Sequence, residues 1–249
     1  MLVREQEAPR PYRSPSDVQV LDRSEAFDLG HNLPRAPLQL FAAGDARLLH
    51  APVRVSVVGA RDASPEGLRR AAKLAAQLVD HRVVVVSGLA DGVDAVAHRA
   101  VISAGGRTIA VIGTPLDRCY PAKHQALQEA IYRDHLLVTQ FPVGSRVQAS
   151  NFPARNRTMA MLSHASVIVE ASDSSGTLSQ AAEIQRLGRS LFIMRSLVEN
   201  RRLAWPAAFL KSGAQILDDV AQILSACAHG GCSRDGGVQQ LPLHELSPE

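Results

Sequence analysis

The sequence predicts an α/β fold: a doubly wound, mostly parallel sheet with helices on both faces. From Val53 onward, short runs of β-branched residues alternate with amphipathic segments, and this alternation is typical of a parallel sheet covered by helices. Runs such as VVVVS and TIAVI are apolar at every position, as expected of strands buried between two helical layers.

Six strands are expected in this region. They are Val53–Val58, Arg82–Ser87, Arg107–Ile112, Leu136–Thr139, Ser166–Glu170 and Ser190–Met194. The amphipathic segments predict helices near 65–80, 93–104, 123–133, 154–163 and 176–187, then short ones around Pro206–Lys211 and 218–226. Ser64 is a favourable N-cap for the first helix, and Pro65 suits its first position.

Composition divides the chain into three parts. Residues 1–50 are rich in proline and polar residues, with one apolar patch at Leu38–Ala43, and are expected to form a partly disordered N-terminal extension. Residues 51–226 are expected to form one α/β domain. Residues 227–249, with four glycines up to Gly237, are expected to be a disordered tail.

Charge, cysteines and hydropathy exclude several classes of protein. The formal charge is only +3, so anion binding requires local clustering of basic residues. The sequence predicts no membrane span, because no run of about 18 apolar residues occurs, and the N-terminus lacks the apolar core of a secretory signal. Three cysteines without a disulfide framework indicate the cytoplasm. Cys227 and Cys232 flank His229 but lack the paired ligand spacings of a zinc module, so no metal or cofactor is predicted.

The segment Asn151–Arg157 lies in a run without Asp or Glu, from His135 to Val169. Arginines fork onto phosphate oxygens, and an aromatic ring offers a stacking face to an unpaired base. The segment therefore suits a phosphodiester backbone, although helix arginines that pair with distant carboxylates would give the same pattern. The candidate residues are Arg146, Phe152, Arg155, Asn156 and Arg157.

The carboxyl ends of the strands supply further candidates, because ligands bind there in doubly wound sheets. After the first strand, Gly59 allows close backbone approach to a ligand and Arg61 places a cation, unless Arg61 pairs with Asp62 or another local acid. The dinucleotide pattern G-x-G-x-x-G is absent. After the fifth strand, Ser175, Gly176 and Thr177 open a helix, where free N–H groups favour a phosphate. Ordinary capping by a serine explains that motif equally well.

The end of the second strand is interpreted as a structural loop. Gly88 and Gly92 predict a tight turn with Asp91 as N-cap. Asp94 and His98 share a helical face at i, i+4, and the carboxylate is expected to cap the helix and fix the imidazole. No nucleophile–base pair is evident in the sequence, so catalysis is not predicted.

Taken in order, these motifs resemble the DprA/Smf DNA-processing family, whose core is a Rossmann-like domain of the SLOG superfamily. The resemblance covers roughly residues 38–195. It is carried by Val57–Arg61, Ser87–Asp94 with Ala97-His98, Gly106–Gly113, Tyr120-Pro121, Phe152–Arg157, Val169–Ala171, Ser175–Thr177 and Gly188-Arg189.

The resemblance implies a non-enzymatic protein that binds single-stranded DNA in recombination, transformation or a defence-related role. A RecA-type recombinase and a second copy of the chain are the implied partners. By position, Arg61, Phe152, Arg155, Asn156 and Arg157 would form or support the DNA site. The large apolar residues from Leu191 to Leu210 are expected to pack against a second subunit or the core. Two alternatives remain: a SLOG-type binder or hydrolase of a small nucleotide, and a protein-binding scaffold without a ligand.

Overall fold

The computed structural model describes residues 11–27, 33 and 35–229, and these form a sheet of nine strands in the order β1-β2-β6-β5-β4-β3-β7-β8-β9. Along this sheet order, all neighbouring strands from β6 through β5, β4, β3, β7 and β8 to β9 are parallel. The pairs β1–β2 and β2–β6 are antiparallel. The strands are β1 Gln19–Asp22, β2 Gln39–Gly44, β3 Arg54–Gly59, β4 Val84–Ser87, β5 Thr108–Val111, β6 Leu136–Thr139, β7 Ala165–Glu170, β8 Ser190–Met194 and β9 Gln215–Leu217.

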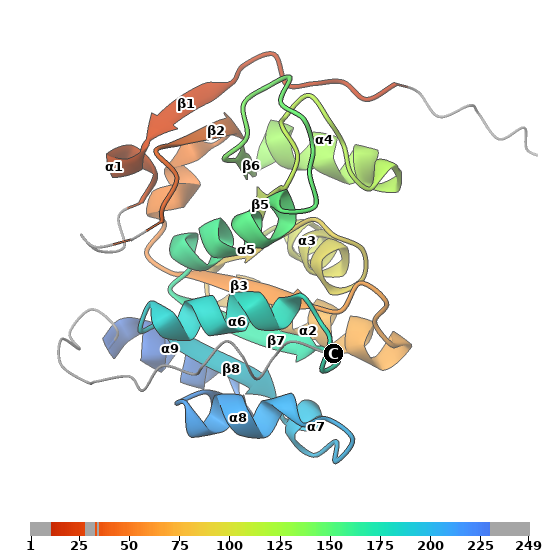
Figure 1. Cartoon of the computed structure of the whole chain (residues 1–249), viewed down its shortest axis with the longest axis vertical. Coiled ribbons are helices and arrows are strands. Elements are labelled where there is room, and N and C mark those ends of the chain that lie inside the picture. The colour runs from red at the N-terminus through yellow and green to blue at the C-terminus, as the bar shows by residue number, and fades with distance from the viewer. Residues whose placement is uncertain (1–10, 28–32, 34, 230–249) are drawn as a thin grey trace, which may run out of the picture.

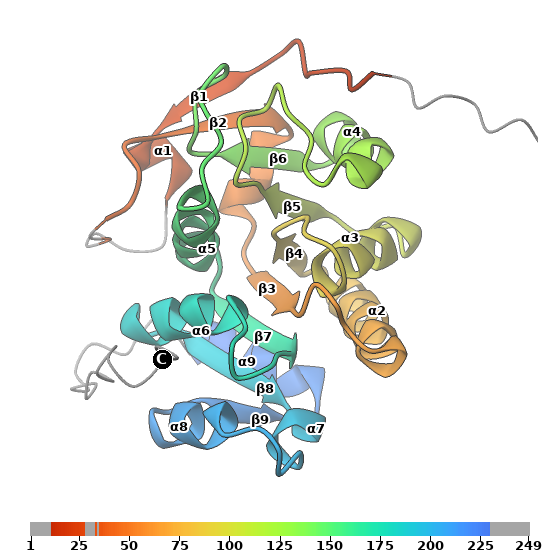
Figure 2. The same cartoon turned by 45° about the vertical axis from the view of Figure 1, so that its right-hand side comes forward.

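Helices cover both faces of this sheet, which confirms the predicted doubly wound fold (Figures 1 and 2). One face carries α2 Pro65–Asp80, α3 Val93–Ser103, α4 Gln125–Asp134 and α9 Val220–His229. The other carries α5 Asn151–Leu162, α6 Thr177–Arg186 and α8 Trp205–Lys211. Short helical turns complete the order: α1 Arg23–Ala26, α7 Arg195–Val198 and the 3₁₀ turns Ala46–His50 and Ala122–His124.

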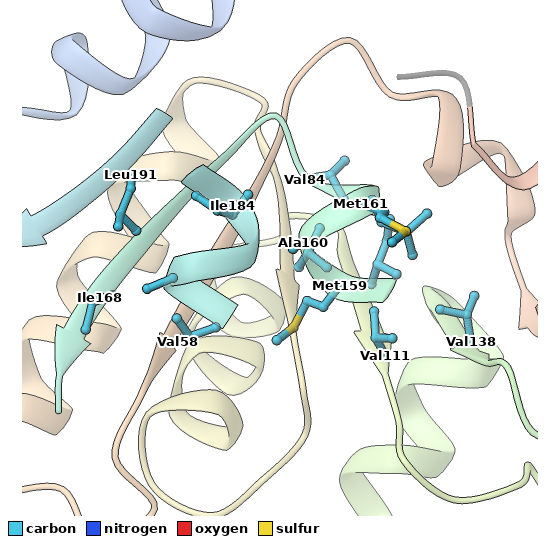
Figure 3. Close-up of a cluster of buried hydrophobic side chains, with 14 of the residues drawn as sticks. Val58, Val84, Val111, Val138, Met159, Ala160, Met161, Ile168, Ile184 and Leu191 are labelled. Carbon is cyan, nitrogen blue, oxygen red and sulfur yellow. The ribbon is translucent and has the colours of Figure 1, made fainter. Parts of the chain in front are cut away.

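The core is layered because successive strand residues point to opposite faces. In β5, Ile109 and Val111 pack toward α5 and α6, while Ala110 packs toward α4. Figure 3 shows Met159, Ala160 and Met161 of α5 in one cluster with strand side chains such as Val84, Val111 and Val138. This packing fixes α5 against the sheet, and α5 carries the arginine-rich segment.

The N-terminal extension contributes two strands that the sequence did not predict. The apolar patch Leu38–Ala43 is largely β2, which places Leu40 and Ala42 in the core and pairs with β6. The strand was not predicted because prolines precede it and because its partner β6 lies about a hundred residues later in the chain. The predicted boundary at residue 50 stays a prediction, although β1 and β2 continue the sheet across it.

The C-terminal part also differs in detail from the expectation. The short strand β9 pairs with β8 and was not predicted. The expected disordered tail, 227–249, begins inside α9, and from residue 230 onward it lies outside the described residues. Across the described ranges, no helix combines the length and apolar character needed to cross a bilayer.

The strand order reverses beside β3, which lies between β4 and β7. Such a switch point opens a crevice outside the carboxyl ends of the strands. Here β3 ends at Gly59 and β7 at Glu170, with an irregular register between Val58 and Gly59. The topology therefore places any ligand site at these two strand ends.

Candidate nucleic-acid interface

A cavity of about 960 Å³ lies at this switch point. Its walls come from the loop after β3, the start of α3, the first two turns of α5, the loop from β7 to α6, and the segment after β8. Of the predicted site residues, those lining it are Gly59, Arg61, Phe152, Arg155, Asn156, Ser175, Gly176 and Thr177, together with Asp94 from the predicted structural loop.

The first loop brings an unpaired cation to the cavity. A Cβ added at Gly59 would lie 2.6 Å from Cγ2 of Val93 and 2.8 Å from the carbonyl oxygen of Glu170, so only glycine fits this close approach. Ser64 caps α2 as predicted, accepting the N–H of Gly67 at 3.0 Å. Arg61 is exposed, and within the described residues its guanidinium makes no ion pair, so it pairs neither with Asp62 nor with another described acid.

Arg61 lies over an aromatic pair. Its guanidinium carbon is 5.5 Å from the ring centroid of Phe152, within the range of a cation–π contact. On α5, Phe152 is half-buried, and its centroid lies 5.7 Å from that of Tyr120, with the two rings inclined by 54°. Tyr120 is 54% exposed. Arg61 and Phe152 therefore line the cavity, and Tyr120 adds a second aromatic ring beside Phe152. The sequence had not singled out Tyr120 as a site residue.

Arg155 occupies a different position from Arg61. It is only 5% exposed, and its NH1 group donates to the carbonyl of Val111 at 3.1 Å. The same NH1 lies 3.9 Å from Oδ2 of Asp94. Burial lowers the pKa of Arg155 and raises that of Asp94, and the attraction between the two charges opposes both shifts. Arg155 therefore joins α5 to β5 and α3 and leaves one small edge in the cavity wall.

The second loop is held by Asp94, although not in the predicted way. Oδ2 of Asp94 accepts the N–H of Gly88 at 3.1 Å, and a Cβ at Gly88 would overlap NH1 of Arg155. His98 instead shares a hydrogen bond of 2.7 Å with Oγ1 of Thr108, and burial lowers the pKa of His98 to about 3. The expectation that Asp94 fixes the imidazole is wrong, because His98 points toward β5.

The predicted N-cap of α3 also has another role. Gly92, with φ of +73°, occupies the cap position. Asp91 lies 2.9 Å from both Nζ of Lys123 and Nε2 of His124. Asp91 therefore ties the second loop to the segment that carries Tyr120.

The loop before α6 is held by hydrogen bonds of Ser175 and Thr177, and Gly176 occupies the N-cap position of α6. Oγ of Ser175 accepts the N–H of Thr177 at 3.2 Å, while Oγ1 of Thr177 donates to the carbonyl of Gly59 at 3.2 Å. Nδ2 of Asn156 donates to the carbonyl of Gly176 at 3.4 Å. A Cβ at Gly176 would meet nothing within 4 Å. Asn156 and Thr177 thus connect three walls of the cavity.

Two predicted arginines lie outside the cavity lining. Arg157 is half-buried two positions after Arg155, about 200° around the helix from it. Arg146 is exposed in the loop between β6 and α5. Sequence reasoning missed Glu170, which accepts hydrogen bonds from N and Oγ of Ser64 at 2.6 and 2.7 Å. Its place as the last residue of a predicted strand was the available signal.

The fold and site define a Rossmann-like binding protein with its cavity at the switch point. A sequence model of the family described as DNA recombination-mediator protein A matches residues 24–228, and the chain belongs to this family. The resemblance seen in the sequence is thereby confirmed.

Individual relatives agree with this assignment. The chain is 40% identical over 171 residues to the DNA processing protein DprA of Streptococcus pneumoniae, covering 69% of this chain and 57% of that protein. The crystal structure of that DprA matches with a TM-score of 0.73 and 32% identity, over 84% of this chain and 74% of the other. The DprA of Helicobacter pylori, described for its single-stranded DNA binding mode, matches with a TM-score of 0.71 and 28% identity, over 84% and 94%. The chain spans about half the length of the curated relatives it matches.

Proposed function

We propose that this chain binds single-stranded DNA at the switch-point cavity and acts in DNA recombination. The observation that carries the proposal is the exposed guanidinium of Arg61, which makes no ion pair with any described residue and lies over the ring of Phe152 at the edge of a cavity of about 960 Å³. A free cation suits a phosphate, and neighbouring aromatic rings suit unpaired bases of any sequence. The H. pylori relative with a single-stranded DNA binding mode supports this choice of ligand.

The residues divide into contacts and supports in this proposal. Arg61 contacts a phosphate, while Phe152 and the exposed Tyr120 provide faces for bases. Arg155 acts as a support, because it is buried and paired with Asp94. Asn156 and Thr177 support the walls through their hydrogen bonds to Gly176 and Gly59.

Outside the cavity, Arg146 and Arg157 would contact the DNA backbone beyond the bound bases. Both lie in the acid-free run, and neither makes an ion pair within the described residues. Their contribution would be electrostatic and independent of sequence.

No catalytic step is part of the proposal. Cys119, in the loop that carries Tyr120, is a thiol and so a possible nucleophile. Burial raises the pKa of this thiol to about 11. It is therefore protonated at neutral pH and is a poor nucleophile.

A RecA-type recombinase and a second copy of the chain are the proposed partners, in the cytoplasm. The apolar segment expected at an interface is mostly used within the chain: Phe192, Trp205 and Phe209 are at most 3% exposed in the core. A homodimer would present two cavities on one particle and raise avidity for long strands. Light scattering at tens of micromolar should give twice the chain mass, and a monomer would contradict the dimer.

Fluorescence anisotropy with labelled oligo-dT tests DNA binding. Because each lost phosphate contact lowers the salt dependence for single strands, Arg61→Ala should weaken binding and reduce the slope of log K against log salt by about 0.7. Phe152→Ala should cost about 1–3 kcal/mol with an unchanged slope, since stacking is not ionic. Lys211→Ala, an exposed charge that does not line the cavity, is the control. Folded variants that bind like the wild type would refute the site.

A length series separates DNA from a mononucleotide. The cavity volume lies near the upper end for small-ligand pockets, roughly 300–1,000 Å³, so a nucleotide alone would also fit. Affinity should rise from dT2 to about dT10, because a groove gains contacts with each added nucleotide. Tight binding of a free nucleotide without gain from longer oligomers would make the protein a nucleotide binder instead.

A further inference from the structure

The segment that follows β8 forms the outer wall of the cavity. Ser196 of α7, and Asn200 and Leu203 of the turn that follows it, line the cavity together with the strand-end loops. In Figures 1 and 2, α7 and the turn toward α8 lie at the end of the sheet where the arrowheads of β7 and β8 point. This wall has no counterpart among the sequence motifs described above.

The wall is fastened to the loop between β7 and α6. Oδ1 of Asp173 accepts the backbone N–H groups of Ala204 at 3.0 Å and Trp205 at 2.9 Å. Nε1 of Trp205 donates to the carbonyl of Ala171 at 3.2 Å, and Trp205 itself is 3% exposed. The turn before α8 therefore keeps a fixed position relative to the cavity.

Two cations lie on this turn without a carboxylate partner. Arg201 and Arg202 are exposed, and neither makes an ion pair within residues 11–27, 33 and 35–229. Arg195, in contrast, is held by Asp218 at 2.6 Å and by Glu199 at 3.9 Å. Glu199, the acid that precedes Arg201 and Arg202 on this turn, is therefore already paired with Arg195. The positive charge at the rim is therefore available to an anion outside the protein.

The turn also offers polar groups toward the cavity itself. Oγ of Ser196 is buried in the wall and has no hydrogen-bond partner among the described residues. A buried hydroxyl without a partner is costly unless a ligand or water completes it. Asn200 uses Oδ1 to accept the N–H of Arg202, and no described residue accepts a hydrogen bond from its amide nitrogen.

We propose that Arg201 and Arg202 bind phosphates of the DNA strand as it leaves the cavity, which extends the binding track across the turn between α7 and α8. This inference rests on the proposed function and adds the direction in which the strand runs: from the aromatic edge at Phe152 and Tyr120, through the cavity, to the α7–α8 turn. Ser196 and Asn200 contact the strand at the point of exit.

The test measures the affinity of the wild type and of the double variant Arg201→Gln/Arg202→Gln for oligo-dT of two lengths. A dT3 probe fills the cavity only, so its affinity should not change. A dT12 probe also covers the turn. Two lost phosphate contacts should lower the salt slope by about 1.4. Between 1 M and 0.1 M salt, the affinity of the variant should therefore fall about 25-fold relative to that of the wild type. Arg201→Lys/Arg202→Lys should retain most of the slope, because the charge is kept.

The matched control is Arg82→Gln/Lys211→Gln, which removes the same charge from two exposed positions that do not line the cavity. Unchanged dT12 binding by the Arg201/Arg202 variant would overturn the track while leaving Arg61-dependent binding intact. An equal loss in the control would also overturn it, because the effect would be one of net charge. A wild type that binds no oligo-dT would overturn the track together with the proposed function.

Discussion

Replacing Arg155 by methionine should destabilise the protein without changing the salt dependence of DNA binding. Its NH1 lies 3.9 Å from Oδ2 of Asp94, and the side chains of Arg155 and Asp94 are 5% and 8% exposed. At that distance, and with an effective dielectric constant near 20, the attraction is about 4 kcal/mol. Removal of one partner from a buried pair typically costs about 3–5 kcal/mol, because the other charge is left uncompensated.

The loss should depend on pH in a defined direction. Burial already raises the pKa of Asp94, and Arg155 opposes that shift. Without Arg155 the pKa of Asp94 rises further, so the folded variant binds a proton that the unfolded chain, with a pKa near 3.8, releases. The free energy of unfolding of the variant should therefore recover relative to wild type as the pH falls from neutral toward about 4.

Urea unfolding followed by the fluorescence of Trp205 measures this effect, since Trp205 is the single tryptophan and is buried. The double variant Asp94→Asn/Arg155→Met closes a thermodynamic cycle and should recover part of the loss. A loss below about 1 kcal/mol, or one that is the same at pH 4.5 and 7, would refute the pairing. A reduced salt slope for the folded variant would instead make Arg155 a phosphate contact.

Two further predictions concern His98 of α3 and Gly59 at the end of β3. Burial lowers the pKa of His98 to about 3, so the unfolded chain binds more protons than the folded one below pH 6.5. Stability should fall by about 1.4 kcal/mol per pH unit from 6.5 toward 3, and His98→Gln should flatten this dependence in urea titrations; an identical slope would contradict it. Gly59→Ala should cost about 1–3 kcal/mol, because its Cβ would lie 2.6 Å from Val93. The melting temperature measures this loss, with Gly176→Ala as the unobstructed control.

Local patterns predicted most of the fold and indicated where the candidate site lies. The parallel strands from β3 to β8 were predicted because each is a short apolar run that needs burial on both faces. Ser64 and Pro65 fixed the start of α2 through capping groups within three residues. Gly59, Arg61 and Thr177 were predicted as site residues from their positions after strands, because ligands bind at strand ends in such sheets. These features depend on residues close together in the chain, so they can be predicted from the sequence alone.

Only the tertiary structure distinguishes the environments of the arginines. Arg155 and Arg157 are equivalent in the sequence, yet one turns into the core toward Asp94 and the other does not line the cavity. The partner of Asp94, the role of Asp91 and the ring of Tyr120 beside Phe152 depend on contacts between segments far apart in the chain. The same holds for β2, whose pairing with β6 outweighs the prolines around it. Burial and pairing are set by the packing of a helix on the sheet, and residue type alone does not specify that geometry.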